Sequence, residues 1–210
     1  MDSLAAELGL ALSAQQAEAL ASYLDLLQRW NSTYNLTAVR DPAAMRVQHL
    51  ADCLAVIPAL QRQMSSGRLM DVGSGGGLPG VVIALMMPGV EVECVDTVAK
   101  KVAFVRQVAG ALKLRNLRAI HARVETLQAP RFDLITSRAF ASLADFTRLT
   151  RAALVPGGVW MAMKGRLPAD EIAQLPPEIE VFHVEQLSVP GLGAQRCLVW
   201  MRPAPATPKN

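Results

Sequence analysis

The chain has 210 residues, of which 51% are hydrophobic, and its formal net charge is +3 with an isoelectric point near 9.0. This length supports one well-buried core and is too short for two ordinary domains with linkers, so we expect one domain. Apolar residues occur in short runs that never approach the roughly 20 residues of a membrane-spanning helix, which argues against a membrane protein.

The N-terminus predicts a protein that stays in the cytoplasm. Residues 1–9 carry Asp2 and Glu7 and lack both a basic start and an apolar stretch, so they do not resemble a secretory signal. The three cysteines lie far apart without a CxxC pair, and the three histidines are equally scattered. We therefore expect neither a disulfide framework nor a bound metal. The mild positive charge permits an acidic partner such as nucleic acid without requiring one.

Residues 1–60 are predicted to form a helical segment that packs on the main domain. Ser13 begins a capping box, and apolar residues at helical spacing continue the first helix over 13–30. Asp41 followed by proline is typical of a helix start. The apolar stripe after it predicts a second helix that ends before Pro58.

Residues 61–202 are predicted to form an α/β domain, with a disordered tail over 203–210. Short β-type runs alternate with amphipathic segments, which is typical of βαβ units and a parallel sheet. The link 190–193 is too short for a crossover helix, so the last two strands should pair antiparallel. The expected fold is a doubly wound, mostly parallel seven-stranded sheet. The predicted strands are 68–72, 91–95, 117–121, 132–137, 156–163, 179–186 and 195–202, and the predicted helices of this domain are 79–87, 98–113, 142–153 and 169–174.

The strongest functional pattern is a glycine-rich turn from Asp71 to Gly80, which reads DVGSGGGLPG between a predicted strand and a predicted helix. Glycines let the backbone turn tightly and approach a ligand where a Cβ would clash. The N–H groups that open the helix would then face the ligand. Asp96 ends the next strand, where its carboxylate can accept both hydroxyls of a ribose. The pattern predicts a nucleoside cofactor, and a purely structural turn is the alternative.

Two nucleoside cofactors fit this turn, because 75–80 also matches the dinucleotide pattern G-x-G-x-x-G. S-adenosylmethionine is favoured over NAD because Asp71 can meet the ammonium group of the methionine, a cation that NAD lacks. After the third strand, the backbone of Val124 and the side chain of Glu125 are candidates to border an adenine. An exposed carboxylate at a helix start explains Glu125 equally well.

Ser137 and Arg138 end the fourth strand, beside the expected methyl donor, where the acceptor should arrive. An arginine there can hold a phosphate or a cofactor carboxylate with two hydrogen bonds, or it can serve only as a structural cap. The sequence has no Asn-Pro-Pro-Tyr type turn after this strand and no cysteine at the ends of strands four or five that could attack a pyrimidine. An acceptor that is already nucleophilic, such as a ring nitrogen with its own lone pair, fits better.

The chain closely resembles the bacterial small-subunit ribosomal RNA methyltransferase G family, also called glucose-inhibited division protein B. The Leu-Pro-Gly end of the turn and the Ser-Arg-Ala after the fourth strand are its most specific parts. The matching pieces are Trp30-Asn31, Asn35-Leu36-Thr37-Ala38, His49-Leu50-Ala51-Asp52, the turn 71–80, Val95-Asp96 with Lys100-Lys101, Arg123-Val124-Glu125, Ser137-Arg138-Ala139 and Lys164-Gly165.

The resemblance implies a Rossmann-like, S-adenosylmethionine-dependent enzyme that methylates N7 of a guanine in 16S rRNA, in the loop near the decoding centre. The expected partner is 16S rRNA or the small ribosomal subunit, with no membrane or metal, and we expect a monomer. The predicted cofactor-binding residues are Asp71, Gly73, Ser74, Gly75, Leu78, Asp96, Val124, Glu125 and Arg138. The acceptor-side candidates are Ser137, Arg138 and Lys164, and the catalytic residue itself is not identified. The RNA-binding candidates are Arg40, His49, Lys100, Lys101, Arg123 and Arg196, each with a structural role as the alternative.

Because N7 of guanine carries a lone pair and no proton, this reaction needs no general base, and we expect positioning to carry the rate. We further expect RNA phosphates to dock on a basic rim made by the N-terminal helices and residues 100–118, which predicts salt-sensitive binding. Three other functions stay open at this point: a methyltransferase for small molecules or proteins, an NAD-linked oxidoreductase, and an RNA-binding module without catalysis.

Overall fold

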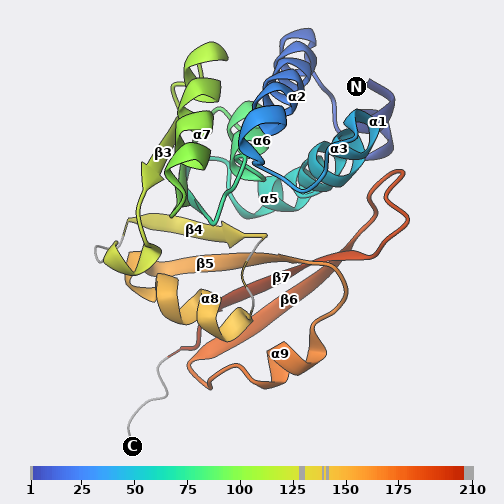
Figure 1. The fold of residues 1–210 in the computed structure, drawn as a ribbon. Coiled ribbons are helices and arrows are strands. Elements are labelled where there is room, and N and C mark those ends of the chain that lie inside the picture. Colours follow the sequence, from blue (N-terminus) through green and yellow to red (C-terminus); the bar gives the residue numbers. More distant parts are fainter. Residues whose placement is uncertain (1, 128–130, 139, 141, 206–210) are drawn as a thin grey trace, which may run out of the picture.

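The protein is described by a computed structural model that covers residues 2–127, 131–138, 140 and 142–205. Seven strands form one sheet in the order β3-β2-β1-β4-β5-β7-β6 (Figure 1). The first five strands run parallel, and the last two pair antiparallel, as predicted. The strands are β1 (Gly67–Val72), β2 (Val90–Asp96), β3 (Leu117–His121), β4 (Phe132–Ser137), β5 (Leu154–Lys164), β6 (Ile179–Leu187) and β7 (Arg196–Pro203).

Helices cover both faces of this sheet, which confirms the predicted α/β architecture of a sheet between two layers of helices. One face carries α6 (Gly80–Met86), α7 (Ala99–Ala111) and the N-terminal helices, and the other carries α8 (Leu143–Thr150) and α9 (Ala169–Ala173) (Figure 1). A short 3-10 turn, η3 (Arg151–Ala153), ends α8. Strand side chains alternate between the faces, so the neighbours Leu69 and Met70 are both fully buried but belong to different apolar cores.

The N-terminal segment contains more helices than predicted. They are α1 (Asp2–Glu7), α2 (Ala14–Tyr34), α3 (Pro42–Met45), the π-helical turn η1 (Arg46–Ala51), α4 (Asp52–Leu54) and α5 (Ile57–Gln63). The capping box at Ser13 is present. The helix that follows runs past the predicted end at Trp30, until Asn35 takes a left-handed conformation with φ 49°.

The second predicted helix ends before Pro58, as expected, because α4 ends at Leu54; a further helix that was not predicted, α5, begins at Ile57. Proline is tolerated in the first turn of a helix because its missing N–H has no partner there, and Pro58 occupies that place in α5. At the other end of the chain β7 extends to Pro203, so the predicted tail begins at least one residue too early. The rest of that prediction, residues 206–210, lies outside the described residues.

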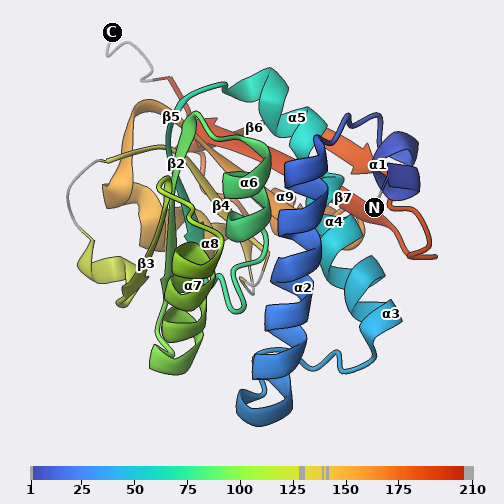
Figure 2. The same cartoon turned by 90° about the horizontal axis from the view of Figure 1, so that it is seen from above.

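The N-terminal segment is packed tightly against the glycine-rich turn. Seen from above in Figure 2, α2 runs alongside α6, and it also contacts α7. Tyr23 of α2 is fully buried, and its hydroxyl donates a hydrogen bond of 2.7 Å to the carbonyl of Gly76. A Cβ atom at Gly76 would lie only 2.9 Å from the Leu27 side chain. The helix and the turn are therefore in direct contact.

Cys53, Cys94 and Cys197 are buried free thiols. Within the described residues, no cluster of three or more His, Cys, Asp or Glu side chains could hold a metal ion. In the same part of the chain, no helix has both the length and the apolar character needed to cross a bilayer.

The contact between Tyr23 and Gly76 gives a stability prediction. Tyr23→Phe removes the donor and leaves a buried carbonyl without its partner, so we expect the free energy of unfolding to fall by about 1–3 kcal/mol. Urea denaturation followed by circular dichroism measures this change. Tyr34→Phe is the matched control, because Tyr34 belongs to the same helix but is 44% exposed. Equal urea midpoints for the two variants would contradict the prediction.

Candidate functional site

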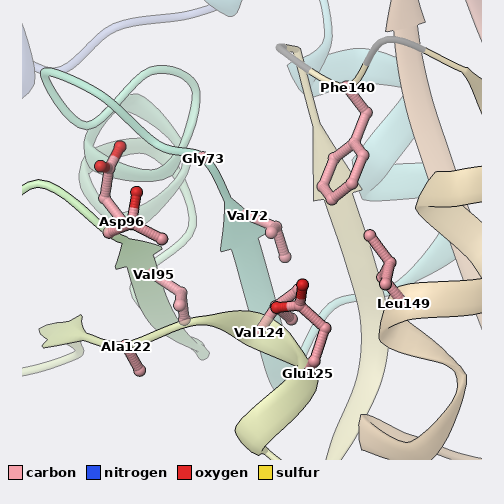
Figure 3. A pocket seen from close by; sticks show the side chains of 10 residues that line it. Val72, Gly73, Val95, Asp96, Ala122, Val124, Glu125, Phe140 and Leu149 are labelled. Atoms are coloured by element: carbon pink, nitrogen blue, oxygen red, sulfur yellow. The ribbon is translucent and has the colours of Figure 1, made fainter.

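A cavity of about 300 Å³ lies at the carboxyl ends of β1, β2 and β3, where the topology of such sheets places ligands. We call it the first cavity (Figure 3). In this view Asp96 lies on one side of it, and Phe140 and Leu149 face it from the other. Its walls are mostly apolar, with one buried carboxylate. The lining residues are Val72, Gly73, Val95, Asp96, Thr97, Ala122, Val124, Glu125, Phe140 and Leu149.

The glycine-rich turn reaches this cavity through its backbone. Gly73 lines the cavity with φ 69°, a left-handed conformation that favours glycine, and its N–H donates to the carbonyl of Val95 over 2.8 Å. At the end of the turn, a Cβ atom at Gly80 would collide with the sulfur of Cys94. Glycine at position 80 therefore allows the start of α6 to lie close against the sheet.

Asp96 is held rigidly in the position predicted for a ribose-binding carboxylate. Its Oδ2 accepts from the N–H of Gly75 at 2.9 Å, and its Oδ1 accepts from the N–H of Val98 at 2.8 Å. The residue is only 6% exposed, yet it lines the first cavity. Each carboxylate oxygen has a further lone pair, so Asp96 can still accept from two ligand hydroxyls.

Asp71 is fully buried and is not among the residues that line the first cavity. Its Oδ2 accepts from the N–H of Gly80 at 2.8 Å, whereas its Oδ1 is buried with no hydrogen-bond partner in the described structure. Burial raises the pKa of this carboxyl to about 7, although the Gly80 N–H and the positive charge of Arg138 oppose the shift. A buried carboxylate oxygen without a partner fits a cationic group such as an ammonium.

Two other residues of the turn have structural contacts. Ser74 is buried, and its N–H lies 3.3 Å from the carbonyl of Val95. Leu78 is 3% exposed and packs in the apolar core beneath the N-terminal helices. Neither residue lines the first cavity, and their contact with a cofactor stays a prediction.

The residues that end β4 point in different directions. The hydroxyl of Ser137 donates to the carbonyl of Val72 over 2.8 Å and so ties β4 to β1. Arg138 is not among the residues that line the first cavity, and it lines a second cavity of about 390 Å³. Of the predicted candidates, His49, Arg138, Lys164 and Arg196 are brought together there. The lining residues of the second cavity are Gln48, His49, Asp52, Arg138, Met163, Lys164, Gly165 and Arg196.

Asp52 is the charged residue of the second cavity that the sequence did not single out as a candidate. Its side chain is 3% exposed and lies between two guanidinium groups. The Nε of Arg196 donates to Oδ1 at 2.9 Å, and an Nη of Arg138 lies 3.4 Å from Oδ2. One sequence feature could have pointed to Asp52, because residues 49–52 form one of the segments that resemble the family.

The other two candidates in the second cavity also have defined partners. His49 is buried, with its Nε2 2.7 Å from the hydroxyl of Thr37. Burial, and then the positive charge of Arg138, lowers the pKa of His49 to about 4, so the ring is neutral at neutral pH. The Lys164 ammonium pairs with Glu171 of α9 at 2.8 Å.

The remaining RNA-binding candidates lie outside both cavities. Arg40 is exposed and donates to the side chain of Asn35 at 2.9 Å. Lys100 and Lys101 belong to the first turn of α7, and Arg123 is exposed just before the 3-10 turn η2 (Val124–Thr126). Their role in binding RNA stays a prediction.

Comparison with known proteins identifies a family model and relatives that match most of this chain. A family model described as GidB, rRNA small subunit methyltransferase G, matches residues 16–199. A protein of Leptothrix cholodnii named Ribosomal RNA small subunit methyltransferase G is 63% identical over 198 residues, covering 93% of this chain and 91% of the relative. A protein of the same name from an Acidovorax species is 59% identical over 206 residues, with coverages of 93% and 91%.

Solved structures resemble the fold more distantly. TrmN from Thermus thermophilus superposes with a TM-score of 0.57 at 25% identity, over 71% of this chain and 48% of its own. A SAM-dependent methyltransferase from Aquifex aeolicus superposes with a TM-score of 0.56 at 14% identity, over 77% and 93% of the two chains. The second likeness is one of fold alone.

The fixed carboxylate of Asp96 gives a binding prediction. Asp96→Asn keeps the shape but removes the charge, so we expect the affinity for S-adenosylmethionine to fall about tenfold or more. Isothermal titration calorimetry with the cofactor or its demethylated product measures this. Glu91→Gln is the matched control, because Glu91 lies near the other end of β2 with an exposed side chain. Equal affinities of the two variants would contradict a role for Asp96 in cofactor binding.

The raised pKa of Asp71 gives a pH prediction. An ammonium group favours the ionised carboxylate, so binding should lower this pKa and release a proton at or below neutral pH. With a pKa of about 7 in the free protein, the affinity for the cofactor should weaken about tenfold between about pH 8 and about pH 6. Titration in buffers of different ionisation enthalpy counts the released proton. The Asp71→Asn variant should show neither effect, and a wild-type affinity that is flat with pH would exclude this role.

Proposed function

Because the chain belongs to the rRNA small subunit methyltransferase G family, we propose that it transfers a methyl group from S-adenosylmethionine to N7 of a guanine in 16S rRNA. The observation that carries this proposal is that both cavities are lined by residues at the carboxyl ends of the parallel strands. The segment after β4 has Arg138 in the second cavity and Phe140 in the first. The Nζ of Lys164, which lines the second cavity, lies 3.5 Å from the carbonyl of Phe140, which lines the first.

The first cavity fits the nucleoside part of the cofactor. Asp96 accepts the ribose hydroxyls, Ala122 and Val124 border the adenine, and the backbone of Gly73 allows close approach. Asp71, behind the turn, offers the negative charge that matches the methionine ammonium. When bound, the cofactor supplies a methyl group on a positively charged sulfur, which a lone pair can displace.

Positioning is the main catalytic task of this chain. The N7 atom of guanine has a lone pair and no proton to remove, so the nucleophilic step requires no general base. Oriented binding of two reactants can supply roughly 7–11 kcal/mol of a barrier. Phe140 gives an aromatic face beside the cofactor cavity, and the cationic side chains of the second cavity hold the RNA strand.

The enzyme recognises the negative charge of the RNA backbone as well as its bases. Arg138, Lys164 and Arg196 lie at the sheet edge where the acceptor must arrive, which favours a polyanionic substrate over a neutral small molecule. The protein would act as a cytoplasmic monomer on 16S rRNA or on the small subunit.

A methyl-transfer assay tests the proposal directly. Labelled S-adenosylmethionine is incubated with 16S rRNA, and separately with small subunits, from cells that lack this protein. We expect label in 7-methylguanosine at one position, located by nuclease mapping. The Asp96→Asn variant should transfer more slowly at limiting cofactor, and Glu91→Gln should match the wild type. Label in protein or in a small molecule, or no label despite cofactor binding, would overturn the rRNA assignment.

A further inference from the structure

We propose that the second cavity binds one phosphate group of the acceptor RNA strand, and that Asp52 is the positioning residue for the two arginines that hold it. This inference rests on the proposed function, because it places the RNA that the enzyme is proposed to methylate. It assigns one contact with the RNA backbone to the second cavity, and it gives the buried carboxylate of Asp52 a role in positioning.

The composition of the cavity favours a phosphate over a base. Three cationic side chains line it, and among the described lining residues Met163 is the one apolar side chain. A base would need a stacking surface, whereas the ring available there is the buried His49, which is engaged with Thr37. Arginine side chains match phosphate oxygens with two parallel hydrogen bonds.

The charges leave room for one anion. Asp52 carries one negative charge between Arg138 and Arg196, so these three residues have a net charge of +1. The pair formed by Lys164 and Glu171 adds no net charge. His49 is neutral because burial and Arg138 depress its pKa. One excess positive charge in a partly buried cavity suits one singly charged phosphodiester.

Asp52 fixes the direction of both guanidinium groups. It engages the Nε of Arg196 and one Nη of Arg138. A guanidinium has five N–H donors, so each arginine can still offer donors to a ligand. The π-helical turn η1 precedes Asp52 directly, and such turns recur at functional sites. The three residues come from α4, the end of β4 and the start of β7, so the carboxylate holds together parts that are distant in sequence.

The place of this phosphate suits the chemistry of the reaction. Methylation at N7 leaves a cationic guanine, whose charge develops as the new bond forms. Because Asp52 pairs with two arginines, the second cavity alone carries one excess positive charge, which would oppose that developing charge. A phosphate of the substrate strand bound there cancels this excess, so the developing cation meets no net repulsion from the cavity.

The salt dependence of RNA binding tests the phosphate contact. Arg196→Ala should raise the Kd for 16S rRNA about tenfold and reduce the slope of log K against log salt by about 0.7, the value for one lost phosphate contact on a single strand. Arg202→Ala is the matched control, because Arg202 lies at the far end of the same strand, is exposed and pairs with Glu180. It should change neither quantity. Filter binding over a range of salt concentrations measures both.

A second pair of variants separates positioning from charge. Asp52→Asn makes the cavity more positive, so a purely electrostatic surface would bind RNA more tightly, whereas loss of positioning weakens binding. We expect weaker binding and a lower kcat/KM for small subunits, with cofactor affinity unchanged. Arg196→Lys keeps the charge but not the two parallel hydrogen bonds, so it should keep the salt slope and lose affinity. Thermal unfolding of each variant shows that it is folded.

The outcomes distinguish this inference from the proposed function. If the wild type methylates 16S rRNA but Arg196→Ala binds it with the wild-type slope of log K against log salt, the proposed phosphate contact is wrong. The proposed methyltransferase function is then unaffected. If Arg196→Ala or Asp52→Asn instead weakens cofactor binding, the second cavity holds the cofactor carboxylate. If the wild type neither binds nor methylates 16S rRNA, the function itself fails.

Discussion

The close packing of the glycine-rich turn between β2 and α2 is the constraint on which the cofactor cavity depends. Gly80 has no side chain, so the start of α6 can approach Cys94, and Asp71 can accept its N–H. On the other side, Tyr23 holds the carbonyl of Gly76. These contacts fix the backbone before any ligand arrives, and a preorganised site loses less conformational entropy on binding.

A second constraint unites distant parts of the chain. A buried carboxylate is costly unless it is paired, so Asp52 requires both Arg138 and Arg196 near it. The N-terminal helices thereby build one wall of the second cavity through Asp52 and support the first through Tyr23. They are structural parts of the catalytic region and cannot be regarded as an addition to a complete methyltransferase domain.

Sequence reasoning reached the sheet and the first cavity because both depend on local patterns. All seven strands fall within about two residues of their predicted bounds. Gly73, Asp96, Val124 and Glu125 line the cavity that the turn and the strand ends predicted. The π-helical turn η1 and the additional helix α5 were not predicted, because tertiary packing overrides local signals. Asp52 was not singled out because its partners lie 86 and 144 positions further along the chain.

The reversed direction of β7 decides which end of that strand lies near the reaction. Because β7 runs antiparallel to β5, its first residue, Arg196, lies at the edge of the sheet where the parallel strands end. Its last residue, Pro203, pairs with Ile179 at the opposite edge. A fluorescent or affinity label attached beyond Pro203 would therefore leave the body on the side away from both cavities. The strand β7 therefore contributes Arg196 to the second cavity at one end and provides an attachment point at the other. From that point the enzyme can be immobilised or detected while it binds a particle as large as a ribosomal subunit.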